Sequence, residues 1–234
     1  SQLGTEILNK GGNAVDAAVA VGFSLAITLP RAGNLGGGGF MLVYIKEKQE
    51  IYYIDYRSSS PLNANIKDLF NTNLPKDYKK TDFDKSRFGH KASAIPGTVA
   101  GLLEAHRNFG KLSLKEILEP VIKQASEGIK VSYDLNKAIE STPQLFNDPE
   151  SRKIYFDNGK LLVKNTLMKR PDLAETLSHI SANGHKGFYE GPTAKKIVEA
   201  MNANNGFMTL EDFKNYKVNS GSPISILYRG NVIF

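Results

Sequence analysis

The sequence predicts an α+β protein in which a layered helix-and-sheet portion comes first and a helix-rich lobe follows. Three observations carry this prediction: an apolar helical pattern at 13–29, two almost continuously apolar strands at 40–45 and 50–55, and mostly helical patterns beyond Gly128. Continuous apolar strands are typical of sheets that are covered on both faces. A hairpin covered on both faces in turn predicts a layered sandwich.

Length and composition are those of a globular chain. The 234 residues suffice to bury a sizeable core, and 41% of them are hydrophobic. The net charge of +6 comes from dispersed basic residues, which favours a solvated basic face over a nucleic-acid-binding stripe. The absence of cysteine excludes disulfides and thiolate nucleophiles. The longest apolar run, 14–29, has 16 residues where a membrane span needs ~20, so no transmembrane segment is predicted.

Capping and breaking residues define the first two helices. A helical pattern at 1–9 ends at the glycine pair 11–12, and Asn13 is a suitable N-cap for the apolar helix that Pro30 ends. The helical pattern is already under way at the first residue, and an apolar strand pattern is still under way at Phe234. We therefore expect a longer parent chain, whose leader is not present in this sequence.

A glycine-rich run, 33–39, lies between the second helix and the first strand. Phosphate loops place glycines after a strand and before a helix, whereas here a helix comes first and a strand follows. This order argues against nucleotide binding. Two interpretations stay open. The glycines let a strand pass under packed neighbours, or they shape a site for a small anion together with Arg57, which lies at the exit of the second strand.

The remaining elements follow from local signals. A polar stretch at 63–89 is expected to form a long loop with one helical turn at 66–70. Ser113 and Thr209 are predicted N-caps, and Gly184 is a predicted C-terminal stop. Beyond the loop we expect helices at 96–109, after Ser113, at 134–140, 172–182 and 192–204, and after Thr209, then a strand at 224–227.

We treat 1–234 as one partial domain. The sandwich-forming helices and the hairpin occupy 1–62 in this prediction. A loop and a mostly helical lobe occupy 63–234, and this lobe returns to a strand near 224–234.

The chain offers few of the residue sets that carry catalysis or metal binding. Its four histidines show no His-x-x-x-His spacing, and no Gly-x-Ser-x-Gly elbow is present, so neither a metal site nor a nucleophile with its base is predicted. Arg57 is the exception, because a guanidinium can fork onto a carboxylate with two parallel hydrogen bonds. That carboxylate could belong to a substrate or to a neighbour such as Asp55, and residue type alone favours the neighbour.

Two long blocks, GGNAVDAAVA at 11–20 and AGNLGGGGFM at 32–41, resemble the large subunit of gamma-glutamyltranspeptidase. The resemblance covers nearly the whole chain. Further blocks fall in the family's order: DYR at 55–57 with Pro61, PGTVAG at 96–101, GFYEG at 187–191, LEDF at 210–213 with Tyr216, and YRG at 228–230.

The resemblance implies a four-layer αββα N-terminal nucleophile hydrolase sandwich, partial in this chain. It implies a precursor that cuts itself into two subunits, with the N-terminal threonine of the small subunit as nucleophile and its own amine as base. Such an enzyme takes the gamma-glutamyl group of glutathione or a related compound and passes it to water or an amino acid, without cofactor or metal. No catalytic residue lies in this chain, and Arg57 matches the arginine that binds the substrate's alpha-carboxylate. A periplasmic or secreted location is also expected.

Two departures from the family's pattern keep alternatives open. Many relatives have Arg-Glu at the position where this chain has Arg57 and Ser58, which two further serines and Pro61 follow. Many relatives also have His-Pro ahead of the glycine block, where this chain has Leu29 and Pro30. A related acylase or capsule-processing transferase on the same fold is therefore one alternative. A relative that binds a ligand or partner without catalysis is the alternative from another class.

Overall fold

The computed structural model of the chain describes residues 2–69 and 87–234. The chain forms two compact units, each built from two segments that are distant in sequence. The first unit comprises Ser1–Asn34 and Phe109–Gly187, and the second comprises Leu35–Asn108 and Phe188–Phe234. The division expected near residue 62 stays a prediction.

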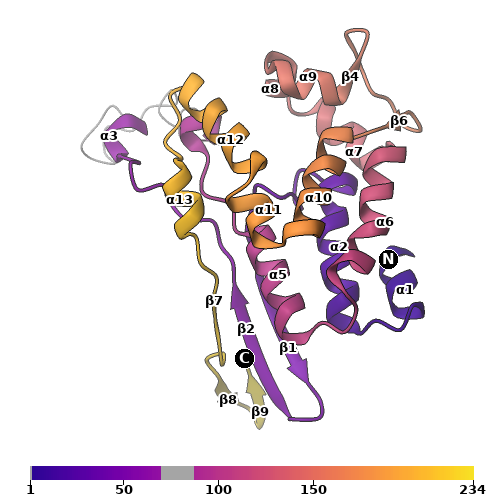
Figure 1. Cartoon of the computed structure of the whole chain (residues 1–234), viewed down its shortest axis with the longest axis vertical. Coiled ribbons are helices and arrows are strands. Elements are labelled where there is room, and N and C mark those ends of the chain that lie inside the picture. The colour runs from indigo at the N-terminus through magenta and orange to yellow at the C-terminus, as the bar shows by residue number, and fades with distance from the viewer. Residues whose placement is uncertain (1, 70–86) are drawn as a thin grey trace. The chain divides into compact units, whose positions relative to one another are not determined.

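The first unit is a group of packed helices (Figure 1). Helix α2 contacts α1 and α6, and α6 contacts α10. The predicted caps are confirmed, since Asn13 and Ser113 each form a capping box and Gly184 ends the last helix. Its four main helices, all expected from the sequence, are α1 (Gln2–Asn9), α2 (Ala14–Thr28), α6 (Leu114–Glu127) and α10 (Pro171–Asn183).

Asp16 joins the start of α2 to the segment that precedes α6. Its side chain is fully buried. The carboxylate accepts hydrogen bonds from the backbone N–H groups of Asn13 at 2.9 Å, Lys111 at 3.0 and 3.1 Å, and Leu112 at 3.2 Å. A buried carboxylate is stable only when its oxygens are satisfied in this way. The acid within the apolar run is thus a structural tie.

Short elements complete the first unit around a second small core formed by Val131, Leu135, Ile139, Leu162 and Met168. Of these short elements, only helix α7 was expected from the sequence. The strands among them have two residues each, which is too short to leave a periodic pattern. They are α7 (Tyr133–Glu140), α8 (Gln144–Asn147), α9 (Pro149–Tyr155), and the antiparallel pairs β3 (Ile129–Lys130) with β6 (Leu167–Met168) and β4 (Phe156–Asp157) with β5 (Lys160–Leu161).

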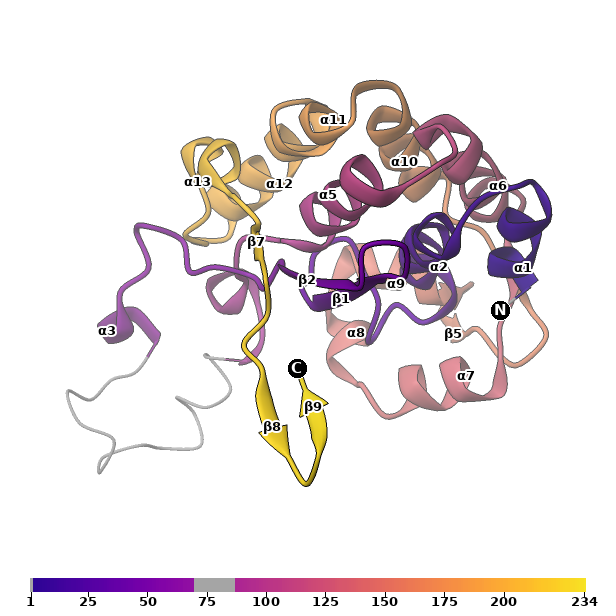
Figure 2. The ribbon, with the colours of Figure 1, turned by 90° about the horizontal axis from the view of Figure 1, so that it is seen from below.

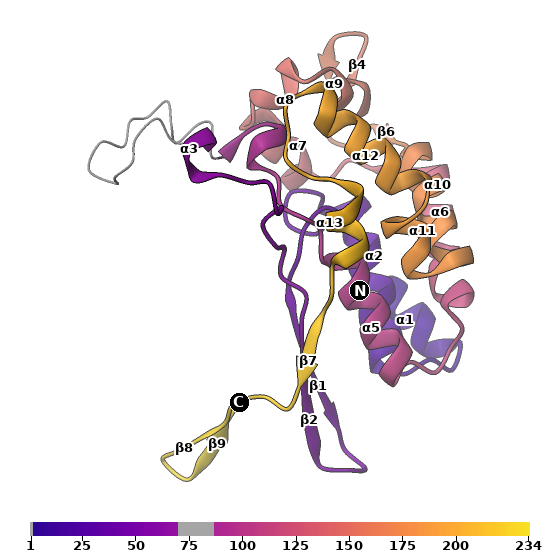
Figure 3. The same cartoon turned by 60° about the vertical axis from the view of Figure 1, so that its left-hand side comes forward.

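The second unit contains an antiparallel sheet in the order β1-β2-β7. Figure 3 shows its three strands side by side. The hairpin of β1 (Phe40–Ile45) and β2 (Glu50–Asp55) has the predicted bounds, and its register pairs Phe40 with Asp55. The third strand, β7 (Asn219–Gly221), was not predicted because its polar sequence carries no strand pattern.

One face of this sheet is exposed in the chain. Phe40, Leu42 and Tyr44 of β1 are 64%, 57% and 54% exposed, whereas Val43 and Ile54 are 6% and 1% exposed. Successive side chains of a strand point to opposite faces, so the exposed residues share one face. The described residues of this chain cover one face of the sheet and leave the other exposed, so the cover that the strand pattern predicts for the second face stays a prediction.

The helices of the second unit agree with the sequence patterns. Thr209 forms the predicted capping box, with Asp212 as its partner. The turn expected at 66–70 is α3, while Phe70 and most of the expected loop lie outside the described residues. The unit's helices are α3 (Ile66–Leu69), α5 (Thr98–Phe109), α12 (Pro192–Ala203) and α13 (Leu210–Asn215), with α11 (His185–Tyr189) crossing the boundary between the units.

The chain ends in a separate two-stranded ribbon, β8 (Ile226–Tyr228) with β9 (Asn231–Ile233) (Figure 2). Its turn places Arg229 and Gly230 at φ values of 49° and 79°, which suits the twist of a tight hairpin. The strand predicted at 224–227 therefore begins two residues later than expected. Among the described residues, no helix combines the length and apolar character needed to cross a membrane.

Candidate functional site

Arg57 lies two residues after the end of β2, at the end of the sheet. The β1–β2 ladder continues one pair beyond the two strands, since Tyr56 N–H donates to the Gly39 carbonyl at 3.0 Å and Gly39 N–H donates to the Tyr56 carbonyl at 3.3 Å. The residue itself is exposed. A backbone ladder therefore holds the peptide that leads into Arg57, while its side chain is accessible to a ligand.

The glycine run allows the backbone around Arg57 to pass. A Cβ on Gly38 would lie 2.5 Å from the backbone nitrogen of Ser58 and 2.6 Å from the Tyr56 carbonyl oxygen. A Cβ on Gly39 would lie 2.9 Å from the Tyr56 ring. Real Cβ atoms do not approach backbone as closely as a Cβ on Gly38 would, so that position needs glycine, whereas a Cβ on Gly39 would displace the Tyr56 ring. The packing interpretation of these glycines is confirmed.

The start of α5 closes the other side of the same segment. A Cβ on Gly97 would lie 2.0 Å from the Tyr56 carbonyl oxygen, and one on Gly101 would lie 2.1 Å from the Tyr56 ring. The N–H groups of Gly97 and Thr98 donate to the Gly37 carbonyl at 2.7 and 3.0 Å. The glycine loop thus occupies two backbone donors at this helix start, so they are not free to bind an anion.

Two tyrosines support the Arg57 peptide. The Tyr216 hydroxyl donates to the Arg57 carbonyl at 2.9 Å. Its ring stacks on Tyr189 at 5.7 Å between centroids, with 4° between the planes. The Tyr189 hydroxyl donates to the Pro96 carbonyl at 2.8 Å and accepts from Ala100 N–H at 3.2 Å. Burial, with the negative charge of Asp55 second, raises the pKa of Tyr216 to about 12, and burial also raises the pKa of Tyr189. Both hydroxyls are therefore protonated near neutral pH.

The residues that follow Arg57 are fixed in place as well. Ser59 and Ile95 exchange backbone hydrogen bonds of 3.2 and 2.8 Å. Leu62 N–H donates to the Asp212 carboxylate at 2.9 Å, and Asp212 is only 2% exposed. That carboxylate also accepts from the N–H and hydroxyl of Thr209. The segment 57–62 is thereby tied to two other parts of the second unit.

The Arg57 guanidinium has no ion-pair partner among the residues that the structure describes. Asp55, the neighbour that residue type favoured, accepts the backbone N–H of Arg57 at 3.0 Å instead. The guanidinium carbon lies 5.6 Å from the centroid of the Phe40 ring, where a cation–π contact restrains it. Its hydrogen-bond donors are available to a carboxylate.

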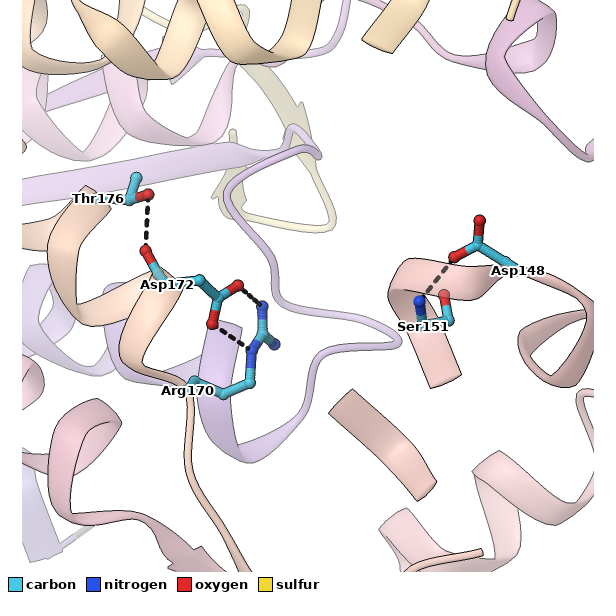
Figure 4. Close-up of polar contacts among 5 residues, drawn as sticks. All are labelled: Asp148, Ser151, Arg170, Asp172 and Thr176. Carbon is cyan, nitrogen blue, oxygen red and sulfur yellow. Dashed lines mark hydrogen bonds and ion pairs between the residues drawn. The ribbon is translucent and has the colours of Figure 1, made fainter. Parts of the chain in front are cut away.

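A second Arg–Asp couple with the same spacing shows what a structural pair looks like in this chain. Arg170 donates from Nε and one terminal nitrogen to Asp172 at 3.2 and 3.1 Å, and its side chain is 14% exposed (Figure 4). Burial tends to raise the pKa of Asp172, but the Arg170 hydrogen bonds and charge outweigh it and lower that pKa. Asp55 and Arg57 adopt no such arrangement.

The described residues also bear on metal binding and on the parts of the site that the sequence did not reveal. The described part of the chain holds no group of three His, Cys, Asp or Glu side chains placed to bind a metal ion. Tyr189, Tyr216 and Asp212 are the site-forming residues that sequence reasoning left without a role. The available signal was their position inside the family blocks at 187–191 and 210–216.

Comparison with known proteins gives this arrangement its context. The gamma-glutamyltranspeptidase family profile matches residues 1–234. The chain is 39% identical to the glutathione hydrolase proenzymes of Pseudomonas aeruginosa and Escherichia coli K12, and each match covers 100% of the chain but only 40% of the relative. The chain thus spans about two fifths of the length of these relatives.

A solved structure agrees with the sequence relatives. The gamma-glutamyltranspeptidase of Helicobacter pylori superposes with a TM-score of 0.90 at 34% identity, over 100% of this chain and 66% of that one. This likeness confirms the predicted mixed helix-and-strand class and the N-terminal nucleophile hydrolase fold. On these matches, the chain belongs to the gamma-glutamyltranspeptidase family.

Proposed function

We propose that this chain is the large-subunit portion of an enzyme that transfers the gamma-glutamyl group of glutathione or a related compound to water or an amino acid. In this proposal a small subunit from the same precursor supplies the N-terminal threonine nucleophile. The chain itself supplies substrate binding. The observation that carries the proposal is the exposed Arg57 guanidinium, which has no described ion-pair partner and sits on a backbone fixed from several sides.

Arg57 would bind the alpha-carboxylate of the gamma-glutamyl donor. A guanidinium presents paired N–H groups that match the two oxygens of a carboxylate, and the pairing is charge-assisted. The alpha-carboxylate lies at the opposite end of the glutamyl group from the amide that is cleaved. The contact therefore orients the donor and acts mainly on ground-state binding.

The test uses the mature full-length enzyme and two donors that differ by one group. One is a gamma-glutamyl anilide, and the other is the 4-aminobutyryl anilide, which lacks the alpha-carboxylate. Arg57→Ala should lower kcat/KM for the first donor by about 30- to 4,000-fold, equivalent to about 2–5 kcal/mol, mostly through KM. Arg57→Lys should recover part of this loss, because it retains charge without the fork.

The control is Arg152→Ala, since Arg152 also lies over a phenylalanine ring, 5.0 Å from the centroid of Phe146, but in the first unit. It should leave both donors unaffected. The 4-aminobutyryl anilide should be insensitive to Arg57→Ala. Equal losses for the two donors, in enzyme that has matured normally, would show that Arg57 serves the fold and not the substrate.

The proposal extends to the compartment. On the family resemblance alone, the full-length protein is proposed to be periplasmic or secreted. Fractionation of cells that express the full-length gene tests this, and recovery of the mature enzyme in the cytoplasmic fraction alone would contradict it.

A further inference from the structure

We infer that Tyr216 is a positioning residue for the Arg57 guanidinium, acting through the hydrogen bond from its hydroxyl to the Arg57 carbonyl. This inference rests on the proposed function, because it assigns to Arg57 the role of binding the donor's alpha-carboxylate. Tyr216 does not touch the substrate. It fixes the peptide from which the arginine side chain projects.

The sheet register brings the two residues together. Asn219 of β7 pairs with Asp55 of β2, and continuing this antiparallel register beyond the strand ends brings Lys217 opposite Arg57, with Tyr216 next to it. Figure 3 shows β7 following α13 and running beside β2. The Tyr216 hydroxyl then reaches the Arg57 carbonyl at 2.9 Å, although the residues are 159 positions apart.

The space for this hydroxyl is made by a glycine. A Cβ on Gly97 would lie 2.1 Å from the Tyr216 hydroxyl oxygen and 2.0 Å from the Tyr56 carbonyl oxygen. The start of α5 thus packs directly against both the hydrogen-bond donor and the peptide before Arg57. In close-packed surroundings of this kind, neither group can move without displacing backbone.

The ring of Tyr216 is also fixed by its neighbours. It stacks on Tyr189, whose hydroxyl bonds to the backbone of Pro96 and Ala100. Helix α13, just before Tyr216, is fixed by its own capping box and by the bond from Leu62 to Asp212. Burial keeps the Tyr216 hydroxyl protonated, since its pKa is raised to about 12. The donor is therefore present throughout the pH range in which such an enzyme is assayed.

Rotation of the Arg57 peptide would swing a long side chain. The guanidinium lies several bonds from the backbone, so a small change at the carbonyl becomes a larger displacement at the fork. A displaced fork no longer matches both oxygens of the donor's carboxylate, which weakens donor binding. The Phe40 contact restrains the guanidinium plane, whereas Tyr216 fixes the backbone from which it starts.

The test is Tyr216→Phe in the mature full-length enzyme, with the gamma-glutamyl and 4-aminobutyryl anilides as donors. This change retains the stacked ring and removes only the hydroxyl. We expect KM for the gamma-glutamyl donor to rise about 5- to 20-fold with kcat changed less than twofold, and the other donor to be unaffected. In an Arg57→Ala background the substitution should add no further loss, because both changes act on one interaction.

The matched control is Tyr53→Phe, which removes a tyrosine hydroxyl bonded to Asn219 at 3.1 Å on the same sheet but away from the Arg57 peptide. It should not change the ratio of the two donors. If Arg57→Ala shows the donor dependence and Tyr216→Phe does not, the positioning role is wrong and the proposed function stands. If Arg57→Ala shows none, the proposed function is wrong. A Tyr216→Phe protein that fails to mature would also overturn the inference, since the hydroxyl would then serve folding.

Discussion

Asp16 provides a sharp test of how the first unit is held together. Its fully buried carboxylate accepts hydrogen bonds from Asn13, Lys111 and Leu112, all backbone N–H groups. Asp16→Asn replaces one acceptor oxygen by an NH2 group. With the amide oxygen in place of Oδ2, which accepts from all three residues, the NH2 group faces the Lys111 N–H. The substitution removes the charge that strengthens these bonds and leaves the buried NH2 group facing a donor instead of an acceptor.

The magnitude follows from those contacts. Hydrogen bonds to a charged group contribute about 1.5–3 kcal/mol each, and a buried unsatisfied donor costs about 1–3 kcal/mol. Since the amide oxygen retains part of the network, we expect a loss of roughly 3–5 kcal/mol in the free energy of unfolding. For a chain of this size, that loss corresponds to a fall in Tm of roughly 6–20 °C.

Thermal unfolding monitored by far-ultraviolet circular dichroism measures the loss of stability, and amide hydrogen exchange at Lys111 and Leu112 localises it. The control is Asp157→Asn, an exposed aspartate in a short ribbon of the same unit, which should change stability by less than about 0.5 kcal/mol. If Asp16→Asn and Asp157→Asn unfold at the same temperature, the carboxylate is not the structural tie described here.

Three further outcomes are expected. Gly97→Ala should destabilise the second unit by about 1–3 kcal/mol, because its Cβ would overlap Tyr56 and Tyr216. Gly4→Ala in α1 should be tolerated, because its Cβ would lie 3.3 Å from its nearest neighbour, the side chain of Val21, and denaturant titration compares the two variants. A polypeptide of this sequence alone should self-associate through the exposed face of β1, and sedimentation velocity should show less association for Leu42→Lys. A wild-type polypeptide that sediments as a dispersed monomer would contradict this expectation. The same polypeptide should show no turnover of a gamma-glutamyl anilide above buffer; activity that copurifies with it would refute the absence of a nucleophile.

The sequence predicted best those features whose causes are local. Asn13, Ser113 and Thr209 each cap a helix because a short side chain reaches a backbone N–H two or three residues on. The β1–β2 hairpin was likewise predicted with its strand bounds, since a short polar turn joins two apolar runs. Such signals lie within a few residues of the structure that they determine.

Features that depend on distant pairing were not predictable. The strand Asn219–Gly221 is polar and exists only because β2 offers it a partner more than 160 positions away. The contact of Tyr216 with Arg57 depends on that pairing. The Arg57 side chain itself was identified from residue type and resemblance, but its freedom from Asp55 required the backbone geometry. Residue type alone favoured the opposite answer.

The most direct test of the account is a crystal structure of the mature full-length enzyme with glutamate bound. We predict that both alpha-carboxylate oxygens lie within about 2.7–2.9 Å of Arg57 guanidinium nitrogens. We also predict that the Tyr216 hydroxyl remains bonded to the Arg57 carbonyl. A bound glutamate whose alpha-carboxylate is held elsewhere, with Arg57 paired to a protein carboxylate, would contradict it.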